Sequence, residues 1–426
     1  MNAPREALSV RDAIDTVLAD VAVLEAERVA LPDALGRVLA ADVIAPLSLP
    51  PWDNASMDGY AVRAEDIRGA SSTSARQLRV IGTIAAGGSS TRSVGAGEAF
   101  RIMTGAPLPA GADSVVRVED TDGGEATVSV LSDRDATRNV RPRGEDVARG
   151  DVAVHAGTEL HAGQLGFLAS VGCAAASVHR RPRVAVLASG DELVDVDRFD
   201  EVLAGAKIVT SNSYSLDAAA REAGARVISL GTVGDDPAAL RERLTRCDCD
   251  LLLTTGGVSV GAFDYTRGVL AELGMQQRFW RVRMRPGAPV GFGMLRGVPW
   301  LGLPGNPVSA LVTFELFARP AIRKMLGHTR QFRRTVRARL QEDVVLSAPL
   351  THFLRARVEE RDGQLLARLT GPQGSGLLSS MARANALLVV PEDRVRVSAG
   401  DELPAILLHD DLAHADAPAF VTKGTA

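Results

Sequence analysis

The sequence predicts a multidomain protein that combines an α/β domain, built on a parallel sheet, with helical and β-rich parts before and after it. Its length of 426 residues suggests roughly three domains, since a domain usually has about 150 residues. Strand-like and helix-like segments alternate between residue 183 and about residue 327. Alternation of this kind indicates a parallel sheet that helices cover on both faces.

The composition is that of an ordinary globular protein. Hydrophobic residues make up 46% of the chain and charged residues 23%, and the formal net charge of −4 favours neither nucleic acid nor an anionic membrane. The N-terminus lacks the basic flank and apolar run of a signal peptide, and no stretch of 18 apolar residues offers a membrane span. Cys173, Cys247 and Cys249 form no zinc-type pair and are interpreted as reduced thiols. We therefore expect a cytoplasmic protein.

The first part of the chain predicts a helical domain that is interrupted by a β-rich insertion. Apolar residues follow helical spacing over 6–30, and a helical pattern returns at 162–172 with Gly172 as its end. The proline-rich stretch 45–52 leads into the insertion. Its strands are expected at 77–84, 114–120 and 126–132, with a hairpin turn at Asp122-Gly123-Gly124. The domain ranges that follow are 1–52 with 140–181 for the helical domain and 53–139 for the inserted domain.

Residues 182–327 are assigned to the α/β domain. Its strands are expected at 183–188, 207–210, 226–231, 249–255 and 299–303. They are rich in Val, Leu and Ile, and the Asp236-Pro237 pair is a typical helix start. After His328, short strands around the Arg361-Asp362-Gly363 turn predict a small β-barrel or sandwich at 328–409. The polar, alanine-rich tail at 410–426 is expected to be disordered.

Three unusual loops follow strands of the predicted parallel sheet. They are SGDEL (189–193), TTGGVSVGAFD (254–264) and LPGNPVSA (303–310). Ligands of open α/β sheets bind beyond the carboxyl ends of the strands. A Gly-Gly turn with free N–H groups ahead of a helix also makes a cradle for anions. One such loop is as easily a tight turn without a ligand, but three together favour a binding site.

Charged side chains of both signs accompany these loops. Carboxylates are expected near the strand ends, at Asp191, Glu192, Asp235, Asp236 and Asp264. Converging carboxylates repel one another unless a cation lies between them, and their hard oxygens suit Mg²⁺. The ordinary alternative is a loop acid or a helix cap, above all for Asp235 and Asp236. Arg281, Arg283 and Arg285 alternate, so they share one face of a strand, where they could hold an oxyanion or lie on a solvated edge.

Two segments near the predicted domain crossing also look functional. They are DNASMDGYAV (53–62) and FRIMTGAPLPAGADSVV (100–116), and both are too rich in Gly, Pro and polar residues for core packing. The chain has no HExxH, P-loop or GxGxxG motif, so it does not match the zinc proteases or nucleotide-binding folds that those motifs mark.

Together these segments resemble the MoeA/gephyrin family of molybdopterin molybdotransferases, from about residue 8 to residue 408. The matching motifs are DNASMDGYAV, RIMTGAPLPAGAD, RPRGEDV (141–147), SGDEL, TTGGVSVGAFDY, MRPGAP, LGLPGNPVSA and GSGLLSSMARANALLVVP (374–391). The resemblance implies an elongated four-domain homodimer with a MogA-like α/β domain. It also implies a transferase that takes adenylylated molybdopterin, cleaves the adenylate and inserts molybdate at the dithiolene, with Mg²⁺ or another divalent metal.

The resemblance assigns roles residue by residue. Catalytic roles fall to Asp264, Glu192, Asp58 and Arg285, and metal binding to Asp264, Glu192 and Asp146. The phosphate and adenylate site includes Gly256, Gly257 and Ser259, and the molybdate is surrounded by Arg285, Ser309, Arg355 and Ser375. Further binding roles fall to Thr104, Arg281, Pro304 and Asn306. Asp58, Thr104 and Asp146 are implied to reach the site from the partner subunit.

The chain departs from the family pattern at three places. Ala288 stands where the family commonly has the lysine of PGK, which normally faces the oxyanion, so the affinity for molybdate is in question. DNASMDG replaces DNSAMDG and ASGDEL replaces STGDEL, and both changes are mild. The implied protein partners are a second copy of the chain, the molybdopterin adenylyltransferase and the molybdoenzymes that accept the cofactor, with no nucleic acid or membrane.

Two other functions fit parts of the sequence. A molybdopterin-binding or scaffold protein would keep the fold without the insertion chemistry, and Ala288 is the residue that favours it. A nucleotide-cleaving enzyme of the CinA type would share a related glycine loop. DNASMDGY and GSGLLSSMARAN argue against the CinA type, whereas Asp58, Glu192, Asp264 and Arg285 favour the transferase.

Overall fold

The computed structural model of the protein describes residues 7–256, 263–347, 349–409 and 411–414. They fall into two compact units, Arg28–Val178 and a second unit that joins Met1–Glu27 to His179–Ala426. No helix in these residues is both long and apolar enough to cross a membrane. The four domain ranges given above stay predictions.

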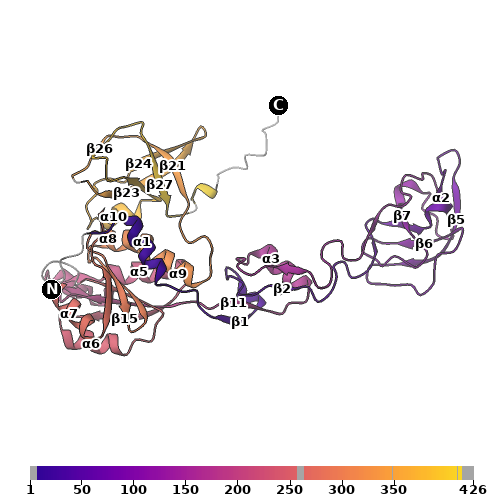
Figure 1. Cartoon of the computed structure of the whole chain (residues 1–426). Coiled ribbons are helices and arrows are strands. Elements are labelled where there is room, and N and C mark those ends of the chain that lie inside the picture. The colour runs from indigo at the N-terminus through magenta and orange to yellow at the C-terminus, as the bar shows by residue number, and fades with distance from the viewer. Residues whose placement is uncertain (1–6, 257–262, 348, 410, 415–426) are drawn as a thin grey trace. The chain divides into compact units, whose positions relative to one another are not determined.

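The unit 28–178 contains a five-stranded sheet in the order β7-β4-β6-β5-β8 (Figure 1). Its strands are β4 (Gly59–Val62), β5 (Arg76–Ile84), β6 (Glu98–Ile102), β7 (Ser114–Arg117) and β8 (Thr127–Val130), with the short helix α2 (Ala64–Ile67). Tyr60, Ile67 and Val116 are buried together in one of its cores. The three strands that the sequence predicts here are confirmed as β5, β7 and β8.

The predicted hairpin turn at Asp122-Gly123-Gly124 is confirmed, but the hairpin is short: Thr121 and Val130 form an antiparallel bridge across the turn, and β7 takes no part in it. Strands β7 and β8 lie at opposite edges of the sheet and do not pair with each other. The Asp122 carboxylate instead closes a local turn, accepting hydrogen bonds from the amides of Gly124 (3.1 Å) and Ser129 (2.9 Å). The sequence marked the turn correctly but carried no information about which strand β8 would join, since that choice depends on side chains far away in the chain.

The rest of this unit consists of small paired strands and one regular helix. Its elements are β1 (Ala26–Ala30), a 3₁₀ turn (Leu31–Ala34), β2 (Val43–Ile44), β3 (Asn54–Ala55), a second 3₁₀ turn (Val118–Asp120), β9 (Val140–Arg141), β10 (Val152–Val154), α3 (Ala162–Ser170) and β11 (Ala175–His179). The pairs are β1 with β11, β2 with β10 and β3 with β9. Helix α3 confirms the prediction at 162–172, and Gly172 follows it with a φ of 81°.

The helical spacing over 6–30 predicts one long helix, and this is wrong beyond residue 19. Helix α1 (Val10–Ala19) begins after Ser9, whose side chain accepts a hydrogen bond from the amide of Asp12, and it ends at Asp20. Ala13 and Val17 of α1 are buried in the core of the α/β region. After α1, Val21 and Leu24 pack in the same core without being helical, and the apolar residues that follow belong to strand β1, so the continued spacing does not mark one helix.

A six-stranded sheet in the order β15-β12-β16-β20-β19-β17 forms the centre of the second unit. The strands are β12 (Arg183–Ser189), β15 (Arg226–Val233), β16 (Leu251–Thr255), β17 (Met275–Phe279), β19 (Gly291–Leu295) and β20 (Val298–Leu303). Strands β15, β12, β16 and β20 are parallel, as predicted. Strands β19 and β17 add an antiparallel edge that the sequence analysis missed.

The antiparallel edge depends on a tight turn between β19 and β20. Leu295 pairs with Val298, and the two residues between them, Arg296 and Gly297, have φ values of 52° and 86°. Positive φ at both positions matches the two-residue hairpin turn whose twist suits antiparallel strands. Arginine is unusual at the first position, which is why the sequence did not signal a hairpin.

The strand predicted at 207–210 does not belong to this sheet. Residues Ile208–Val209 form β14, which pairs only with β13 (Leu193–Val194) in a separate two-stranded ribbon. A 3₁₀ turn (Val196–Arg198) and helix α4 (Phe199–Leu203) connect the two strands. Ile208 is exposed, so the segment lacks the burial on both faces that a central parallel strand requires.

Helices cover both faces of the sheet, because alternate residues of β12 point into two different cores. Val184 and Val186 lie in one core and Ala185 and Leu187 in the other. The first core is covered by α5 (Ser211–Glu222), α8 (Pro307–Thr313), a π-helical turn (Phe314–Ala318) and α9 (Arg319–Met325). The second core is covered by α6 (Pro237–Thr245) and α7 (Phe263–Glu272). The predicted start of α6 is confirmed, since Asp236 caps it by accepting from the amide of Ala238 at 2.8 Å.

The C-terminal region is a closed barrel of five strands, joined at one edge by β18 (Met284–Arg285). Its strands are β21 (Thr335–Leu340), β23 (Thr351–Arg361), β24 (Gln364–Leu369), β25 (Ala386–Val390) and β27 (Glu402–Leu407). Smaller elements are β22 (Val344–Val345), α10 (Leu378–Ala382), β26 (Arg396–Val397) and a 3₁₀ turn (Asp411–Ala413). Closure follows from the pairing of β23 with both β24 and β25, so the barrel alternative of the prediction is the correct one. Most of the predicted tail lies outside the described residues.

Candidate functional site

The three predicted loops meet through backbone atoms of Ser189, Gly256 and Gly305. Gly256 follows β16 with a φ of 84°, and a Cβ atom there would lie 2.1 Å from the carbonyl oxygen of Ser189 at the end of β12. A Cβ on Gly305, after β20, would lie 3.7 Å from the Cα of Gly256. Only glycine can adopt this conformation in so little space. The prediction that the loops after β12, β16 and β20 converge at one edge is therefore confirmed.

Asn212 in the first turn of α5 links two of these loops. Its Nδ2 donates to the hydroxyl of Thr255 at 2.9 Å and to the carbonyl of Gly305 at 2.8 Å. The residue is only 8% exposed, and its Oδ1 has no hydrogen-bond partner among the described residues. The sequence analysis missed Asn212 as a site residue, because a polar residue at the start of a helix has the ordinary explanation of a cap.

The rest of the glycine loop is not described. Gly257 and Ser259 lie outside the described residues, and Asp264 is described only by its backbone, at the second position of α7. Their assigned roles at the phosphate stay predictions. The described end of the loop is Gly256, whose backbone is fixed by its neighbours as shown above.

Carboxylates do converge beside the loop after β12. The carboxylate of Asp191 accepts a hydrogen bond from the amide of Asp235 at 2.9 Å. Burial raises the pKa of Asp235, and the negative charges of Asp191 and Glu192 raise it further. Asp236, by contrast, is the cap of α6. Three of the five predicted carboxylates thus share one location, although no group of three or more His, Cys, Asp or Glu residues within the described ranges is arranged to hold a metal ion.

The loop after β20 also contacts the C-terminal barrel region. Asn306 caps α8 and donates from Nδ2 to the hydroxyl of Ser375 at 3.1 Å. The amide of Val308 donates to the carbonyl of Ser375, also at 3.1 Å. Two residues that the resemblance assigns to ligand binding, far apart in the chain, are therefore in direct contact. Pro304 is buried at the start of the same loop.

The turn after the arginine row packs against α8. A Cβ on Gly287 would lie 3.7 Å from the carbonyl oxygen of Ser309. Ser309 is only 3% exposed, so this serine does not face solvent in the structure. Ala288 is half-buried, and its carbonyl oxygen accepts from the amides of Val282 and Val290, each at 3.0 Å. The backbone around position 288 is thus held without help from a side chain there.

The three alternating arginines do share one face. Arg281, Arg283 and Arg285 are exposed, while the residues between them, Val282 and Met284, are buried. Arg283 is already paired with Glu392, at 3.1 Å, so the ordinary alternative holds for this member of the row. Arg285 donates to the hydroxyl of Ser347. Arg281 and Arg285 keep exposed guanidinium groups that suit an oxyanion.

Arg355 occupies a different place from the one expected of a residue beside molybdate. It is completely buried in β23 and donates from Nε to the Ser380 hydroxyl (3.0 Å) and from Nη2 to the Gly374 carbonyl (2.9 Å). Burial lowers the pKa of its guanidinium to about 10. These bonds fix the segment that carries Ser375. In the described structure Arg355 is therefore a positioning residue rather than an exposed oxyanion ligand.

Asp58 and Thr104 are brought together in the unit 28–178. One carboxylate oxygen of Asp58 accepts from both the amide and the hydroxyl of Thr104, each at 2.7 Å. These two bonds lower the pKa of Asp58, so the exposed carboxylate is ionised at neutral pH. Gly59 beside it is required by packing, because a Cβ there would lie 1.9 Å from the carbonyl oxygen of Val116. Asp146, in the same unit, is exposed, and its amide donates to the carbonyl of Leu49 at 2.9 Å.

Comparison with known families matches nearly the whole chain in three parts. Residues 8–172 match the MoeA N-terminal region (domains I and II), residues 185–324 match a probable molybdopterin binding domain, and residues 337–408 match the MoeA C-terminal region (domain IV). The order and extent of the three matches agree with the motifs found in the sequence.

Characterised relatives and solved structures give the same result. The chain is 41% identical to molybdopterin molybdenumtransferase 2 of Mycobacterium tuberculosis, over 88% of this chain and 93% of the relative. It is 34% identical to the molybdopterin molybdenumtransferase of Staphylococcus aureus, over 96% of this chain and 97% of the relative. A crystal structure of a molybdopterin biosynthesis MoeA protein from Pyrococcus horikoshii matches with a TM-score of 0.82 at 30% identity, over 95% of this chain and all of the other. The fold class predicted from the sequence is thereby confirmed, and the chain belongs to the MoeA family.

Proposed function

We propose that this protein inserts molybdate into adenylylated molybdopterin and releases AMP, which yields the molybdenum cofactor. Membership of the family makes the chain a transferase of molybdenum cofactor biosynthesis. The insertion step and the roles of individual residues in it go beyond what family membership shows. The observation that carries them is the contact of Asn306 with Ser375, because it joins the glycine loops to the segment assigned to molybdate.

The arrangement suits a substrate with a phosphate at one end and an oxyanion at the other. Gly256 and Gly305 let the loops after β12, β16 and β20 come together at one edge of the sheet, and backbone N–H groups at such turns favour negative charge. Arg281 and Arg285 offer exposed guanidinium groups, which bind tetrahedral oxyanions by charge-assisted hydrogen bonds. Asn306, which follows Gly305, contacts Ser375 and would orient the substrate.

The carboxylates beside the glycine loops offer oxygens of the type that a divalent cation prefers, although the described ones are not grouped to hold it without Asp264. Burial raises the pKa of Asp235 most, and the negative charges of Asp191 and Glu192 add to it, so a cation there would relieve repulsion between oxygens of the type that Mg²⁺ prefers. Glu192, with Asp264 from the start of α7, would hold it. When bound, such an ion neutralises charge on the phosphates of the substrate. The metal role of Asp146 rests on the family resemblance alone.

We also propose that the active form is a cytoplasmic homodimer. The resemblance implies that each subunit supplies Asp58, Thr104 and Asp146 to the site of the other subunit. Hydrogen bonds from Thr104 orient the ionised carboxylate of Asp58, which supports this role. The molybdopterin adenylyltransferase and the molybdoenzymes are its expected partners. A fully active monomer in sedimentation experiments at micromolar concentration would exclude the shared site.

The direct test is incubation of the protein with adenylyl-molybdopterin, molybdate and Mg²⁺, with AMP release and cofactor formation as the two readouts. Both products should form together and require molybdate. AMP release without cofactor would indicate a nucleotide-cleaving enzyme instead. Neither product, with tight binding of molybdopterin, would favour the scaffold alternative.

Ala288 is the one residue that favours that alternative, and Ala288→Lys tests it. If position 288 faces the oxyanion, a restored cation should lower the half-saturating molybdate concentration by roughly 10- to 150-fold, the range of about 1.5–3 kcal/mol for a charge-assisted contact. The backbone bonds of residue 288 do not involve its side chain, so the variant should fold. Unchanged saturation by molybdate would show that position 288 does not face the oxyanion.

A further inference from the structure

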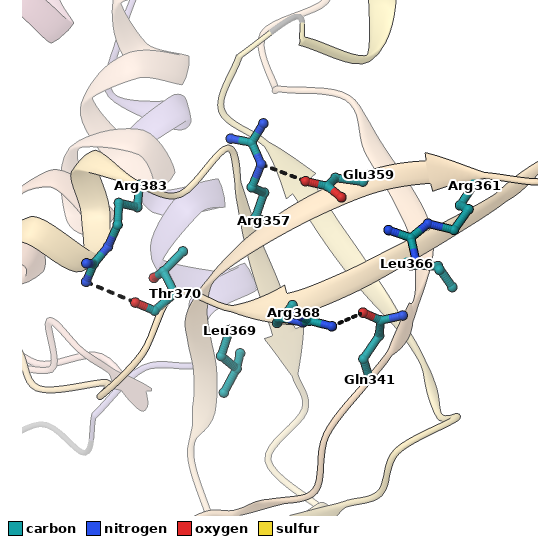
Figure 2. Close-up of a pocket in the computed structure, with 9 residues that line it drawn as sticks. All are labelled: Gln341, Arg357, Glu359, Arg361, Leu366, Arg368, Leu369, Thr370 and Arg383. Carbon is teal, nitrogen blue, oxygen red and sulfur yellow. Dashed lines mark hydrogen bonds and ion pairs between the residues drawn. The ribbon is translucent and has the colours of Figure 1, made fainter.

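An arginine-rich pocket of about 430 Å³ lies on the C-terminal barrel, outside the site described above. Figure 2 shows its lining side chains, which come from strands β23 and β24 and from the chain segments beside them. The charged and amide-bearing members are Arg357, Glu359, Arg361, Arg368, Arg383 and Gln341. None of them has a role in the proposed molybdate insertion.

The pocket holds four guanidinium groups but only one carboxylate. Glu359 accepts from Arg357 at 2.9 Å, which leaves the other three arginines without an acidic partner in the lining. Arg368 donates to the amide oxygen of Gln341 at 3.3 Å and Arg383 to the carbonyl of Thr370 at 3.2 Å, so both keep their full charge. The side chain of Arg361 makes no hydrogen bond or ion pair with any part of the chain that the structure describes.

The register of the β23–β24 hairpin makes this clustering unfavourable for the hairpin itself. Arg357 and Arg368 are directly opposite each other in the antiparallel pairing. Like charges at directly opposed positions destabilise a strand pair, whereas a glutamate opposite an arginine would stabilise it. Core packing does not require the arrangement, because Ala356, Val358 and Ala367 fill the barrel interior on the other side of these strands. An anion bound in the pocket would attract both guanidinium groups and so offset the repulsion between them.

The lining also limits what the anion can be. Four of its nine residues are arginines, which only donate hydrogen bonds, whereas Glu359 is the single lining residue that only accepts, and this balance suits a ligand that offers acceptors. It contains no aromatic side chain on which a nucleobase or another flat ring could stack. A volume of about 430 Å³ lies within the range of small-molecule sites, and several guanidinium forks within it suit closely spaced, highly charged groups.

From these observations we infer that the pocket binds the phosphate chain of an oligophosphate. The chain comes either from a free inorganic polyphosphate or from a nucleoside triphosphate whose base stays outside the pocket. Because recognition is by charge and donor geometry alone, tripolyphosphate and ATP bind with similar affinity, and AMP binds far more weakly. The affinity falls as the ionic strength rises, since the pocket is open to solvent.

Isothermal titration calorimetry of the full chain with tripolyphosphate, ATP, AMP and octaglutamate tests the inference. Arg361→Gln and Arg368→Gln should each weaken tripolyphosphate binding by about 10-fold, as expected for loss of one charge-assisted contact at an exposed site. Arg396→Gln is the matched control, because this exposed arginine lies on the same barrel outside the pocket lining. Its affinity should stay within about twofold of the wild type, since only long-range charge is removed.

Arg368→Glu provides a second, independent readout. It places a glutamate opposite Arg357, so the melting temperature should rise while tripolyphosphate binding is lost. Loss of binding in a more stable protein cannot be due to unfolding. A fall in melting temperature with unchanged binding would contradict both the register argument and the site.

Four results would contradict the inference. One is the absence of tripolyphosphate binding to the full chain at millimolar concentration. Another is octaglutamate binding as tightly as tripolyphosphate, which would identify a general polyanion surface. The third is binding that is lost in Arg285→Gln but unchanged in Arg361→Gln, which would place the anion at the proposed insertion site. A clear preference for ATP over tripolyphosphate would contradict the exclusion of the base.

Discussion

At the amino end of strands β12 and β16 the charged groups are paired, whereas at the carboxyl end of the same strands they are not. Before β16, the Asp250 carboxylate accepts from Arg180 at 2.5 and 2.7 Å and from the amide of Arg183 at 2.7 Å. After the strands, Asp191 and Glu192 crowd Asp235, and Oδ1 of Asn212 has no partner among the described residues. The paired and the unpaired charges are separated only by the length of these strands, seven residues in β12 and five in β16.

The difference indicates that stability and function are placed at opposite ends of one sheet. Ion pairs that are mostly buried and fully hydrogen-bonded resist disruption, because removal of one partner leaves a charge without compensation. Like charges and unsatisfied polar atoms cost free energy in the protein alone and are expected where a ligand completes them. Substitutions at the amino end should therefore affect stability, and substitutions at the carboxyl end should affect turnover.

Gly256→Ala should have the largest effect. The new Cβ would lie 2.1 Å from the carbonyl oxygen of Ser189 at a φ of 84°, so the loop must move. We expect AMP release to fall on the order of 10²–10³-fold, as for misplacement of a binding group by about 1 Å. Gly268→Ala in α7 is the control, because open space surrounds that position and alanine favours a helix. Wild-type turnover in Gly256→Ala would show that the close approach is dispensable.

Asp250→Asn should mainly lower stability. The two arginines would lose their carboxylate in a largely buried position, at a cost of about 3 kcal/mol in the free energy of unfolding. Urea denaturation measures this loss, and turnover measured well below the melting temperature should be unchanged. A large loss of turnover in a folded Asp250→Asn protein would contradict the claim that the amino end of the sheet affects stability alone.

Asn212→Ala should lower turnover much more than stability. The hydroxyl of Thr255 and the carbonyl of Gly305 would lose the donor that holds them, so the two loops should separate. We expect turnover to fall by roughly 30-fold, while the free energy of unfolding falls by only about 1 kcal/mol, as for loss of a modest hydrogen-bonded group. A loss of stability as large as that of Asp250→Asn, with normal turnover, would assign Asn212 to the structure alone.

The pH dependence of stability gives the smallest effect and sharpens the comparison. Burial acts to raise the pKa of Asp250, but hydrogen bonds from Arg180 and Arg183 outweigh it and bring the pKa down to about 2. Because the folded pKa is below the ordinary value of 3.8, Asp250 stabilises the protein above about pH 4 and stops doing so as the pH falls through 2. Its contribution is about 2 kcal/mol at pH 6, with about half lost by pH 3.

The difference in unfolding free energy between wild type and Asp250→Asn measures this contribution directly. This difference should become smaller as the pH is lowered from 6 to 3. Protonation removes the negative charge of Asp250 from the wild type, and the variant has no such charge at any pH. A difference that stays constant over this range would mean that the carboxylate charge does not contribute.

Much of the fold could be predicted because local pattern fixes it. The apolar runs of β12, β16 and β20 and the turn at Asp362-Gly363 depend on residues next to one another in the chain. The Arg296-Gly297 hairpin and the separate ribbon of β13 and β14 were missed, since neither has a strong local signal. The partner of β8 was also missed, because strand order is decided by which distant side chains share a core.

The sequence by itself determined the family, the parallel strands and the glycine and carboxylate residues at their carboxyl ends, because these are motifs of consecutive residues. Only the tertiary structure decided which of those residues meet. It joined Asn306 to Ser375, linked Thr255 and Gly305 through Asn212, and buried Arg355 away from solvent. The physical reason is that burial and hydrogen-bond partners depend on residues far apart in the chain, 43 to 93 positions for these hydrogen bonds, whereas a motif records only the chemistry available at its own position.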